Sequence, residues 1–514
     1  MELHKSTAAE QGRVVQDLNE RALSACSEAK EYGEAGEFEA ARSALRGFWD
    51  RVGERPALEG LDAAARAEIL LRVGSLSGSI GSAQQSSGAQ EIAKDLMTES
   101  ASLFDKLGLV ERRAEAQIDL AICYWREGAV DEARITLDDA LARLGELESE
   151  QRLRALLNKA IVEQVSNRPK DALQILQGAA PLFETNDNHA LRGKFHNEFA
   201  TVFKNIGLAE RREDYIDRAL IEYAAASFHL EEAGHKRYQG VVENNLGFLF
   251  VHLGKFESAH QHIARACAAA SALKDRGLIA QFDDTRARAL LAQRRYREAE
   301  VVAVGAVRLL EEGGQQSLLA EALTTRAVAL ARLGQSESAL ADLNRATSVA
   351  EGAGDLERVG IAALTVIEEL EQTVSGASLR EYYDKAESNL ALSQHAGIQL
   401  RLGKCARTIL AAEDERSKVE VHGENGSRPA QFAGLGFEAA GMLAECSLEE
   451  EVLRYEGGLI KRALDTSGGS VTRAARLLGI THQGLAFILN GRHRDLLSAR
   501  TPVKPRRRSI IRYR

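Results

Sequence analysis

The stretch LGFLFVHLGKFESAHQHIARA, residues 246–266, decides the fold because its spacing recurs along the chain. The spacing consists of a small residue, an apolar residue at +3, glycine at +7, and alanine at +12 and +19, here Gly247, Phe250, Gly254, Ala259 and Ala266. It starts again at Ala121 and at Ala327. A spacing that returns in this way indicates a repeat protein.

Weaker copies of the spacing fill most of the remaining chain. They start at Ala29, Ala160 and Ala287, and two more, from Gly74 and Ala200, fit when seven residues are inserted after the glycine. The positions equivalent to Ala259 then fall at 93, 133, 172, 219, 259, 299 and 339. We expect helical hairpins, in which alanines let two antiparallel helices approach and the glycine relieves the turn. Each hairpin leaves an apolar face for the next one, so the stack becomes a solenoid.

The repeat pattern resembles tetratricopeptide repeats over about residues 20–395, with helices somewhat longer than the usual repeat of about 34 residues. HEAT-type repeats share the longer period, but the order of small, apolar, Gly, Ala and Ala positions favours the tetratricopeptide interpretation. The resemblance implies a concave groove for a protein, a peptide or occasionally a small ligand, whose identity stays open.

Composition and charge favour an all-α protein with two unlike parts. The chain of 514 residues is 45% hydrophobic and has only 6 Pro, so it can bury large cores and breaks few helices. Its net charge is −9, yet residues 454–514 hold 14 Lys and Arg against 3 Asp and Glu. A basic end on an acidic body predicts contact with a polyanion such as double-stranded DNA.

The sequence predicts four consecutive regions. Residues 1–395 form the solenoid, and residues 396–446 form a linker region with a polar, Gly-rich part. Residues 447–497 form a small helical domain, and residues 498–514 form a basic tail with two prolines, which excludes one continuous helix. The tail contacts DNA or is a solvated extension; the sequence leaves both open.

Within the small domain, GGSVTRAARLLGITHQGLAFILNGRH, residues 468–493, predicts two short helices joined by a Gly-Ile-Thr turn. Ser470 and Thr481 are placed as helix caps, and Gly479 is placed to end the first helix. We expect a shared core whose members come from both helices and the turn, namely Ala474, Ala475, Leu478, Ile480, Leu485, Ile488 and Leu489.

This region, about residues 447–493, resembles the Fis-type helix-turn-helix at the C-terminus of bacterial transcription activators. The resemblance implies that an upstream helix, around residues 448–464, forms a homodimer and that the last helix enters the major groove. The chain departs from the family in having Gly484 inside that helix and in its longer tail. As a whole, it resembles bacterial regulators that join tetratricopeptide repeats to such a domain.

We expect two sets of DNA contacts, the first implied by the resemblance and the second by the basic side chains around it. The base-facing positions are Thr481, His482, Gln483, Ala486, Phe487 and Asn490. The phosphate-binding positions are Arg473, Arg476, Arg492, Arg494, Arg506, Arg507 and Arg508. Gln483 and Asn490 can pair with adenine edges, and Ala486 or Phe487 can meet a thymine methyl group. The alternatives are internal packing for Phe487 and plain solvation for Gln483 and the arginines.

Other classes of function lack their motifs. The sequence has no P-loop, no His-Glu-x-x-His and no Gly-x-Ser-x-Gly, so we expect no enzyme, cofactor or metal site. Its five scattered cysteines, with no apolar segment for a signal peptide or membrane helix, favour a cytoplasmic, nucleoid-associated protein. The leading hypothesis is a sequence-specific transcriptional regulator. The alternative is a protein-interaction scaffold with a nonspecific basic docking module.

Overall fold

The computed structural model describes the backbone of residues 2–423 and, further along, of residues 457, 460–467, 469, 471–478, 485, 488–489, 491–493 and 496. The side chains are described for residues 16–410 and for most of those C-terminal positions. The chain divides into two compact units, Met1–Gly423 and Glu424–Arg514. The described residues are helices and turns without strands, so the all-α prediction is confirmed.

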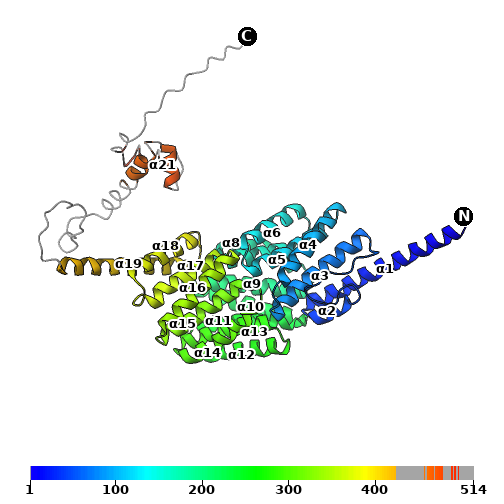
Figure 1. Ribbon diagram of the computed structural model, residues 1–514, viewed down its shortest axis with the longest axis horizontal. Helices are drawn as coiled ribbons and strands as arrows, with labels where there is room; N and C mark the ends of the chain where they lie inside the picture. Colours follow the sequence, from blue (N-terminus) through cyan, green and yellow to red (C-terminus); the bar gives the residue numbers. More distant parts are fainter. Residues whose placement is uncertain are drawn as a thin grey trace, which may run out of the picture. The chain divides into compact units, whose positions relative to one another are not determined.

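The first unit is an array of helical hairpins, in which each helix packs against the next (Figure 1). Its helices are α1 (Glu2–Ala35), α2 (Phe38–Ala44), α3 (Ala63–Gln84), α4 (Ala89–Lys106), α5 (Val110–Glu127), α6 (Val130–Leu144), α7 (Glu150–Val165), α8 (Pro169–Glu184), α9 (His189–Glu210), α10 (Glu213–Glu232), α11 (Lys236–His252), α12 (Phe256–Ala272), α13 (Arg276–Ala292), α14 (Tyr296–Glu311), α15 (Gln316–Arg332), α16 (Ser336–Ala353), α17 (Leu356–Leu370), α18 (Gly376–Leu390) and α19 (Ala396–Gly423).

The repeated alanines lie where the two helices of a hairpin cross. Those at the +12 and +19 positions are at most 2% exposed: Ala133, Ala140, Ala172, Ala179, Ala219, Ala226, Ala259, Ala266, Ala299, Ala306, Ala339 and Ala346. The +7 glycines of the three clearest copies, Gly128, Gly254 and Gly334, have φ values of 97°, 70° and 79°. Only glycine adopts such values without strain, so these three end the first helix of their hairpins as expected.

The two copies with inserted residues differ from this expectation at their glycines. Gly81 and Gly207 lie inside α3 and α9, which have 22 residues each against 17 in α11. The left-handed residues that end these two helices are Gln85 and Arg211. The insertion therefore lengthens the helices. Gly81 and Gly207 serve close helix contact, since an added Cβ would lie 2.2 Å and 2.8 Å from side-chain atoms of the neighbouring helix.

The first and second helices of a hairpin have different surroundings. In α5 eight consecutive residues, 114–121, are buried, including Glu115 and Asp119. In α12 the buried residues form a single stripe, Ala259, Ile263, Ala266 and Ala270. A helix buried on all sides lies inside the array, whereas a helix with one buried stripe lies at its surface. The first helices thus form the inner layer and carry its buried polar groups.

The array coils back on itself, so that helices and turns ten to twelve helices apart meet. The α3–α4 turn meets the start of α15, where Gln85 Nε2 donates to Gln315 Oε1 over 2.8 Å. The α7–α8 turn meets α17 and α18, where Asn167 bonds Glu357 and accepts from the Gln394 backbone N–H at 2.9 Å. Helices α13 and α19 contact α3 and α9 in the same way. These contacts enclose the inner layer.

The prediction that the array ends at residue 395 differs from the structure. Helix α19 begins at Ala396, and four of its residues, Ile398, Leu402, Cys405 and Ile409, are buried in one cluster with residues of α17 and α18. Their spacing of four, three and four residues is that of an apolar helix face. A covering helix therefore occupies the first part of the expected linker, and residues 424–446 lie outside the described residues.

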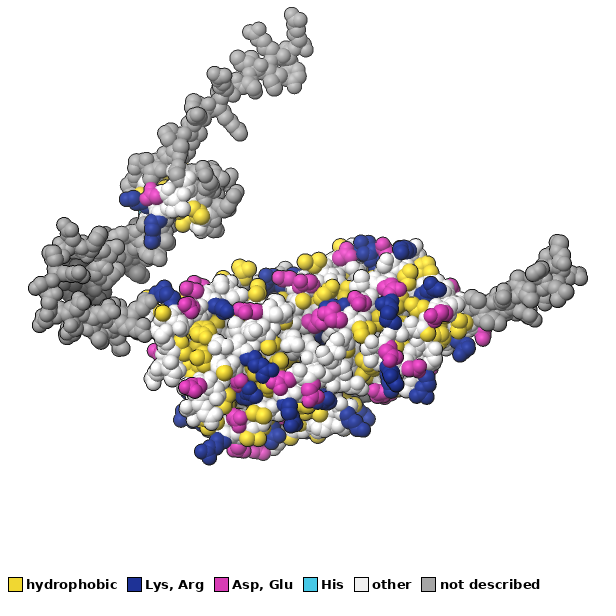
Figure 2. Space-filling view, viewed as in Figure 1, with side chains coloured by type: hydrophobic (Ala, Val, Ile, Leu, Met, Phe, Trp, Pro, Cys, Tyr) yellow, Lys and Arg dark blue, Asp and Glu magenta, His cyan; other side chains and the backbone are white. Residues whose placement is uncertain are grey.

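On the face of the array seen in Figure 2, acidic and basic side chains are interspersed, with apolar groups between them. None of the helices in the described parts of the chain combines the length and apolar character that a membrane crossing needs.

Candidate nucleic-acid interface and interior cavity

The C-terminal unit has a core of its own. Its buried members are Ile460, Ala463, Leu464, Val471, Ala474, Ala475, Leu485 and Leu489, with Leu478, Ile488 and Leu496 packed at the edge. Six of the seven core positions predicted from the sequence are among these residues, and Ile480 lies outside the described residues. Alanines at 474 and 475 let α21 (Val471–Leu477) approach its neighbours closely.

The turn before α21 is fixed by backbone hydrogen bonds. Gly469 has a φ of 77°, and its N–H donates to the carbonyl of Leu464 over 2.8 Å. The Ser467 N–H donates to the carbonyl of Ala463 over 3.0 Å. This pattern ends the helix at residues 460–466 with a left-handed glycine. Gly469 thus belongs to the cap of that helix.

A contact between Gly457 and His493, near the beginning and the end of the described C-terminal residues, has no signal in the sequence. His493 is 6% exposed, and a Cβ added at Gly457 would lie 3.1 Å from two atoms of the His493 ring. Because Gly457 has no side chain, the imidazole of His493 can pack close to the backbone at that position.

The described residues include the core of this unit but few of the predicted DNA contacts. All six base-facing positions, Thr481, His482, Gln483, Ala486, Phe487 and Asn490, lie outside the described residues, as do Arg494, Arg506, Arg507 and Arg508. The backbones of Arg473 and Arg476 belong to α21, and their side chains lie outside the described residues. Arg492 is exposed in the turn beside His493.

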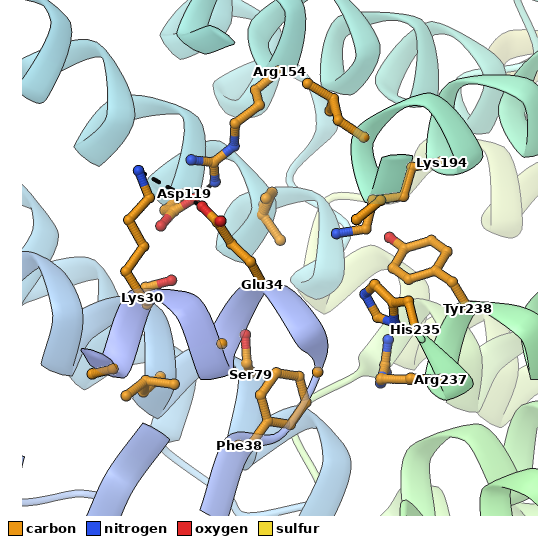
Figure 3. Close-up of a pocket in the computed structure, with 18 of the residues that line it drawn as sticks. Lys30, Glu34, Phe38, Ser79, Asp119, Arg154, Lys194, His235, Arg237 and Tyr238 are labelled. Carbon is orange, nitrogen blue, oxygen red and sulfur yellow. Dashed lines mark hydrogen bonds and ion pairs between the residues drawn. The ribbon is translucent and has the colours of Figure 1, made fainter. Parts of the chain in front are cut away.

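A cavity of about 190 Å³ with charged side chains in its walls lies among the inner helices of the array. Its walls come from α1, α3, α5, α7 and the starts of α9 and α11 (Figure 3). The basic side chains that line it are Lys30, Arg72, Arg126, Arg154, Lys194 and Arg237, and the acidic ones are Glu34, Asp119 and Glu150. Cations therefore outnumber carboxylates on these walls, unlike on the mixed surface.

The carboxylates on one side of the cavity are already engaged. Glu115 is fully buried behind the wall and accepts hydrogen bonds from Arg72 and Arg112, with Arg154 Nη1 3.6 Å away. Arg154 also donates to Asp119 over 2.9 Å. Burial opposes ionisation of Glu115, but the arginines outweigh it and lower its pKa to about 2. This cluster ties α3, α5 and α7 together.

On the opposite side of the cavity, Lys194 has no such partner. Figure 3 shows Lys194, His235, Arg237 and Tyr238 gathered there. Arg237 donates to Asp275 over 2.8 Å, whereas Lys194 forms no ion pair or hydrogen bond with the described side chains. Its Nζ lies 4.9 Å from the centre of the Tyr238 ring. Burial lowers the pKa of Lys194 to about 8; Arg154 and Arg237 add to the shift, whereas Glu34 and Asp119 oppose it.

Arg126 and His235 also have groups without a hydrogen-bond partner among the described residues. Arg126 has no hydrogen bond or ion pair among the described residues, and burial together with Arg237 lowers its pKa. His235 is 2% exposed, and its Nδ1 has no hydrogen-bond partner in the described part of the chain. Burial lowers the pKa of His235 to about 3, so the imidazole is neutral. No sequence motif marks this group because its members come from separate helices.

A second cavity of about 220 Å³ lies further along the inner layer. It is lined by residues of α9, α11, α13 and α15, including Lys204, Asn244 and Arg288. Arg288 donates to Glu321 and lies 2.8 Å from Asp284, so its charge is met within the wall. No group of His, Cys, Asp or Glu among the described residues is arranged to hold a metal ion.

Residues 454–486 match the family model described as bacterial regulatory protein, Fis family. The match includes α21 and most of the described core of the C-terminal unit. No curated protein matches the chain.

Several solved structures are similar to this chain. The Rap protein complexed with competence and sporulation factor is 16% identical, with 68% of this chain and 95% of that chain covered and a TM-score of 0.49. Yeast Tom70 is 14% identical, with 81% and 90% covered and a TM-score of 0.39. The human IFIT1 dimer with PPP-AAAA is 12% identical, with 86% and 90% covered and a TM-score of 0.37. These likenesses concern the fold alone. The chain joins a tetratricopeptide-like helical array to a C-terminal Fis-type helix-turn-helix segment of the kind found in bacterial DNA-binding regulators.

Proposed function

We propose that this chain is a sequence-specific DNA-binding transcriptional regulator whose helical array receives a protein, peptide or small-ligand signal. The observation that carries the proposal is the Fis-family match at residues 454–486, on a unit whose described residues share one core. The excess of Lys and Arg in residues 454–514 supports it, because basic groups release counterions from the DNA backbone.

The roles within the C-terminal unit follow the Fis-type arrangement. The helix that begins near residue 481 enters the major groove, with Gln483 and Asn490 at base edges and Arg473, Arg476 and Arg492 at phosphates. A homodimer through residues 448–464 would place two such helices on a two-fold symmetric operator. In this proposal both units have binding roles and neither has a catalytic one. The proposed place of action is the cytoplasmic nucleoid.

The test is the specificity ratio of the full chain. A binding site is selected from a random duplex library, and the affinities for that site and for scrambled duplexes are compared by fluorescence anisotropy over a range of salt concentrations. We expect a ratio of at least about 10³. A ratio near one would overturn the proposal in favour of a scaffold with a nonspecific basic module.

Two variants separate base contacts from phosphate contacts. Gln483→Ala should weaken binding to the selected site and leave binding to scrambled DNA unchanged, because only a base contact depends on sequence. Arg506→Ala should weaken both equally and reduce the salt dependence by about one ion. Equal losses for both duplexes in Gln483→Ala would remove Gln483 from the base-reading set.

A further inference from the structure

The interior cavity combines an excess of cations with polar groups that have no partner among the described residues. Lys194 and Arg126 line the cavity without an ion pair or hydrogen bond among the described residues. The buried Nδ1 of His235 is unpaired in the same part of the chain. Both cations are half-buried, so they are partly withdrawn from water without gaining a partner in the protein. A negative group in the cavity would supply that partner.

The carboxylates of the cavity act on Lys194 only at a distance, without an ion pair or hydrogen bond to it. Asp119 is held by Arg154 at 2.9 Å. The Glu34 carboxylate lies 3.7 Å from Lys30, and Glu150 accepts a hydrogen bond from Asn188 over 3.3 Å. Figure 3 places Glu34, Asp119 and Lys30 on the side away from Lys194 and His235.

The wall beside these donors also offers apolar contacts. Tyr238 lies between Lys194 and His235, with 5.0 Å between the Tyr238 and His235 ring centres. Phe38 reaches the cavity from the start of α2, and the guanidinium of Arg237 lies 5.8 Å from its ring centre. A ligand here would have an anionic group and a small apolar or aromatic part.

The cavity is closed where two turns of the array meet. An added Cβ at Gly36 would lie 3.0 Å from the His235 ring, so the α1–α2 turn packs directly on the start of α11. Groups from both turns therefore face the same space. A ligand bound there would contact segments about 200 residues apart in sequence, which suits a signal-receiving site.

We propose that this cavity binds a small ligand through a carboxylate or phosphate group, held by Lys194 and Arg126 with His235 beside them. The inference rests on the proposed function in identifying the array as the signal-receiving part, and it names the chemistry of the signal. The two sources of the anionic group, a phosphoryl compound and a carboxylic acid, share the same recognition by cationic donors.

The experiment uses the full chain without DNA, so its outcome is independent of sequence-specific binding. The melting temperature is measured with inorganic phosphate, with acetate, and with a blocked dipeptide that has a free or an amidated C-terminus, each matched in ionic strength by chloride. We expect at least one oxyanion to raise the melting temperature. No rise with any of them would overturn the proposal, whereas a failed specificity ratio would overturn only the DNA-binding function.

Variants and labelling place the effect in the cavity. Lys194→Met and Arg126→Met should abolish the anion-dependent rise and leave the anion-free melting temperature equal or higher, while Lys194→Arg and the exposed control Lys106→Met keep the rise. Limited acylation at pH 8, mapped by mass spectrometry on the unaltered chain, should show Lys194 protected by the anion and Lys106 unprotected. An equal rise in Lys194→Met, or no protection of Lys194, would contradict the assignment.

Discussion

Gly81 of α3 lies so close to Ala89 of α4 that a Cβ at position 81 would stand 2.2 Å from the Cβ of Ala89. The glycine is helical and has no positive φ, so its role is close packing. We expect Gly81→Ala to lower the free energy of unfolding by about 1 to 3 kcal/mol through overpacking. Urea denaturation measures this change.

Gly178 of α8 is the matched control for Gly81. It is also helical, but an added Cβ would have nothing within 4 Å among the described residues. Gly178→Ala should raise the free energy of unfolding by up to about 1 kcal/mol, because alanine loses less backbone entropy in a helix. Equal effects at both positions would contradict the packing role of Gly81.

The Glu115 cluster should contribute strongly to the stability of the array. Glu115→Gln leaves Arg72, which is 6% exposed, without its charged partner, and we expect a loss of about 3 to 5 kcal/mol. Glu146→Gln breaks a 2.9 Å pair with Arg152 in which the glutamate side chain is 95% exposed. That control should lose less than about 1 kcal/mol.

The same cluster predicts that the free energy of unfolding depends on pH in the acidic range. The pKa of Glu115 is lowered to about 2 in the folded chain, from the usual 4.5. The ionised Glu115 carboxylate contributes fully to the free energy of unfolding above pH 4.5. This contribution is lost as the pH falls toward 2, because the unfolded chain then binds the extra proton. Denaturation of the native protein and Glu115→Gln across this range should show the two curves converging. Parallel curves would mean that the carboxylate is not ionised in the fold.

The hairpins were predictable because their signal is local. The spacing of Ala121, Ala133 and Ala140 marks the crossing of one hairpin, and its recurrence gives the stack. The coiling was not predictable, since it depends on contacts such as Gln85 with Gln315, 230 residues apart. The cavity was missed for the same reason. Lys194 and His235 carry no motif, and only the coiling brings them beside α1 and α3.

The small unit shows the opposite balance. Six members of its core, including Ala474 and Leu485, follow from the helix-turn-helix pattern and were predicted. The packing of His493 on Gly457 was missed because it joins residues that share no local pattern.

Glu198 of α9 gives a second pH dependence, of opposite sign to that of Glu115. It is 8% exposed, its Oε1 has no hydrogen-bond partner among the described residues, and burial raises its pKa to about 7. Between pH 4.5 and 7 the folded chain holds a proton that the unfolded chain has lost. The free energy of unfolding should therefore fall as the pH rises, with a slope of at most about 1.4 kcal/mol per pH unit from this group.

The measurement compares denaturation of the native protein with Glu198→Gln from pH 4.5 to 7. Glutamine cannot titrate, so the variant should lack this part of the slope. Glu148→Gln, at an exposed position, should keep it. If the profiles of the native protein and Glu198→Gln coincide, the carboxyl group of Glu198 is not the source of the dependence.

The core of the C-terminal unit should be required for DNA binding, while the helical array is not affected by changes in it. Ala475 is 2% exposed and belongs to the cluster that joins residues 460–464 with Leu485 and Leu489. Ala475→Leu overfills this core and should lower its free energy of unfolding by about 1 to 3 kcal/mol, a large share of the stability of so small a unit.

We expect this variant to lose duplex binding in fluorescence anisotropy while the melting transition of the array stays unchanged. Leu477→Ala, on the same helix but 61% exposed, should bind DNA as the native chain does. Native affinity in Ala475→Leu would show that duplex binding does not depend on this core and would place it in the basic residues beyond it.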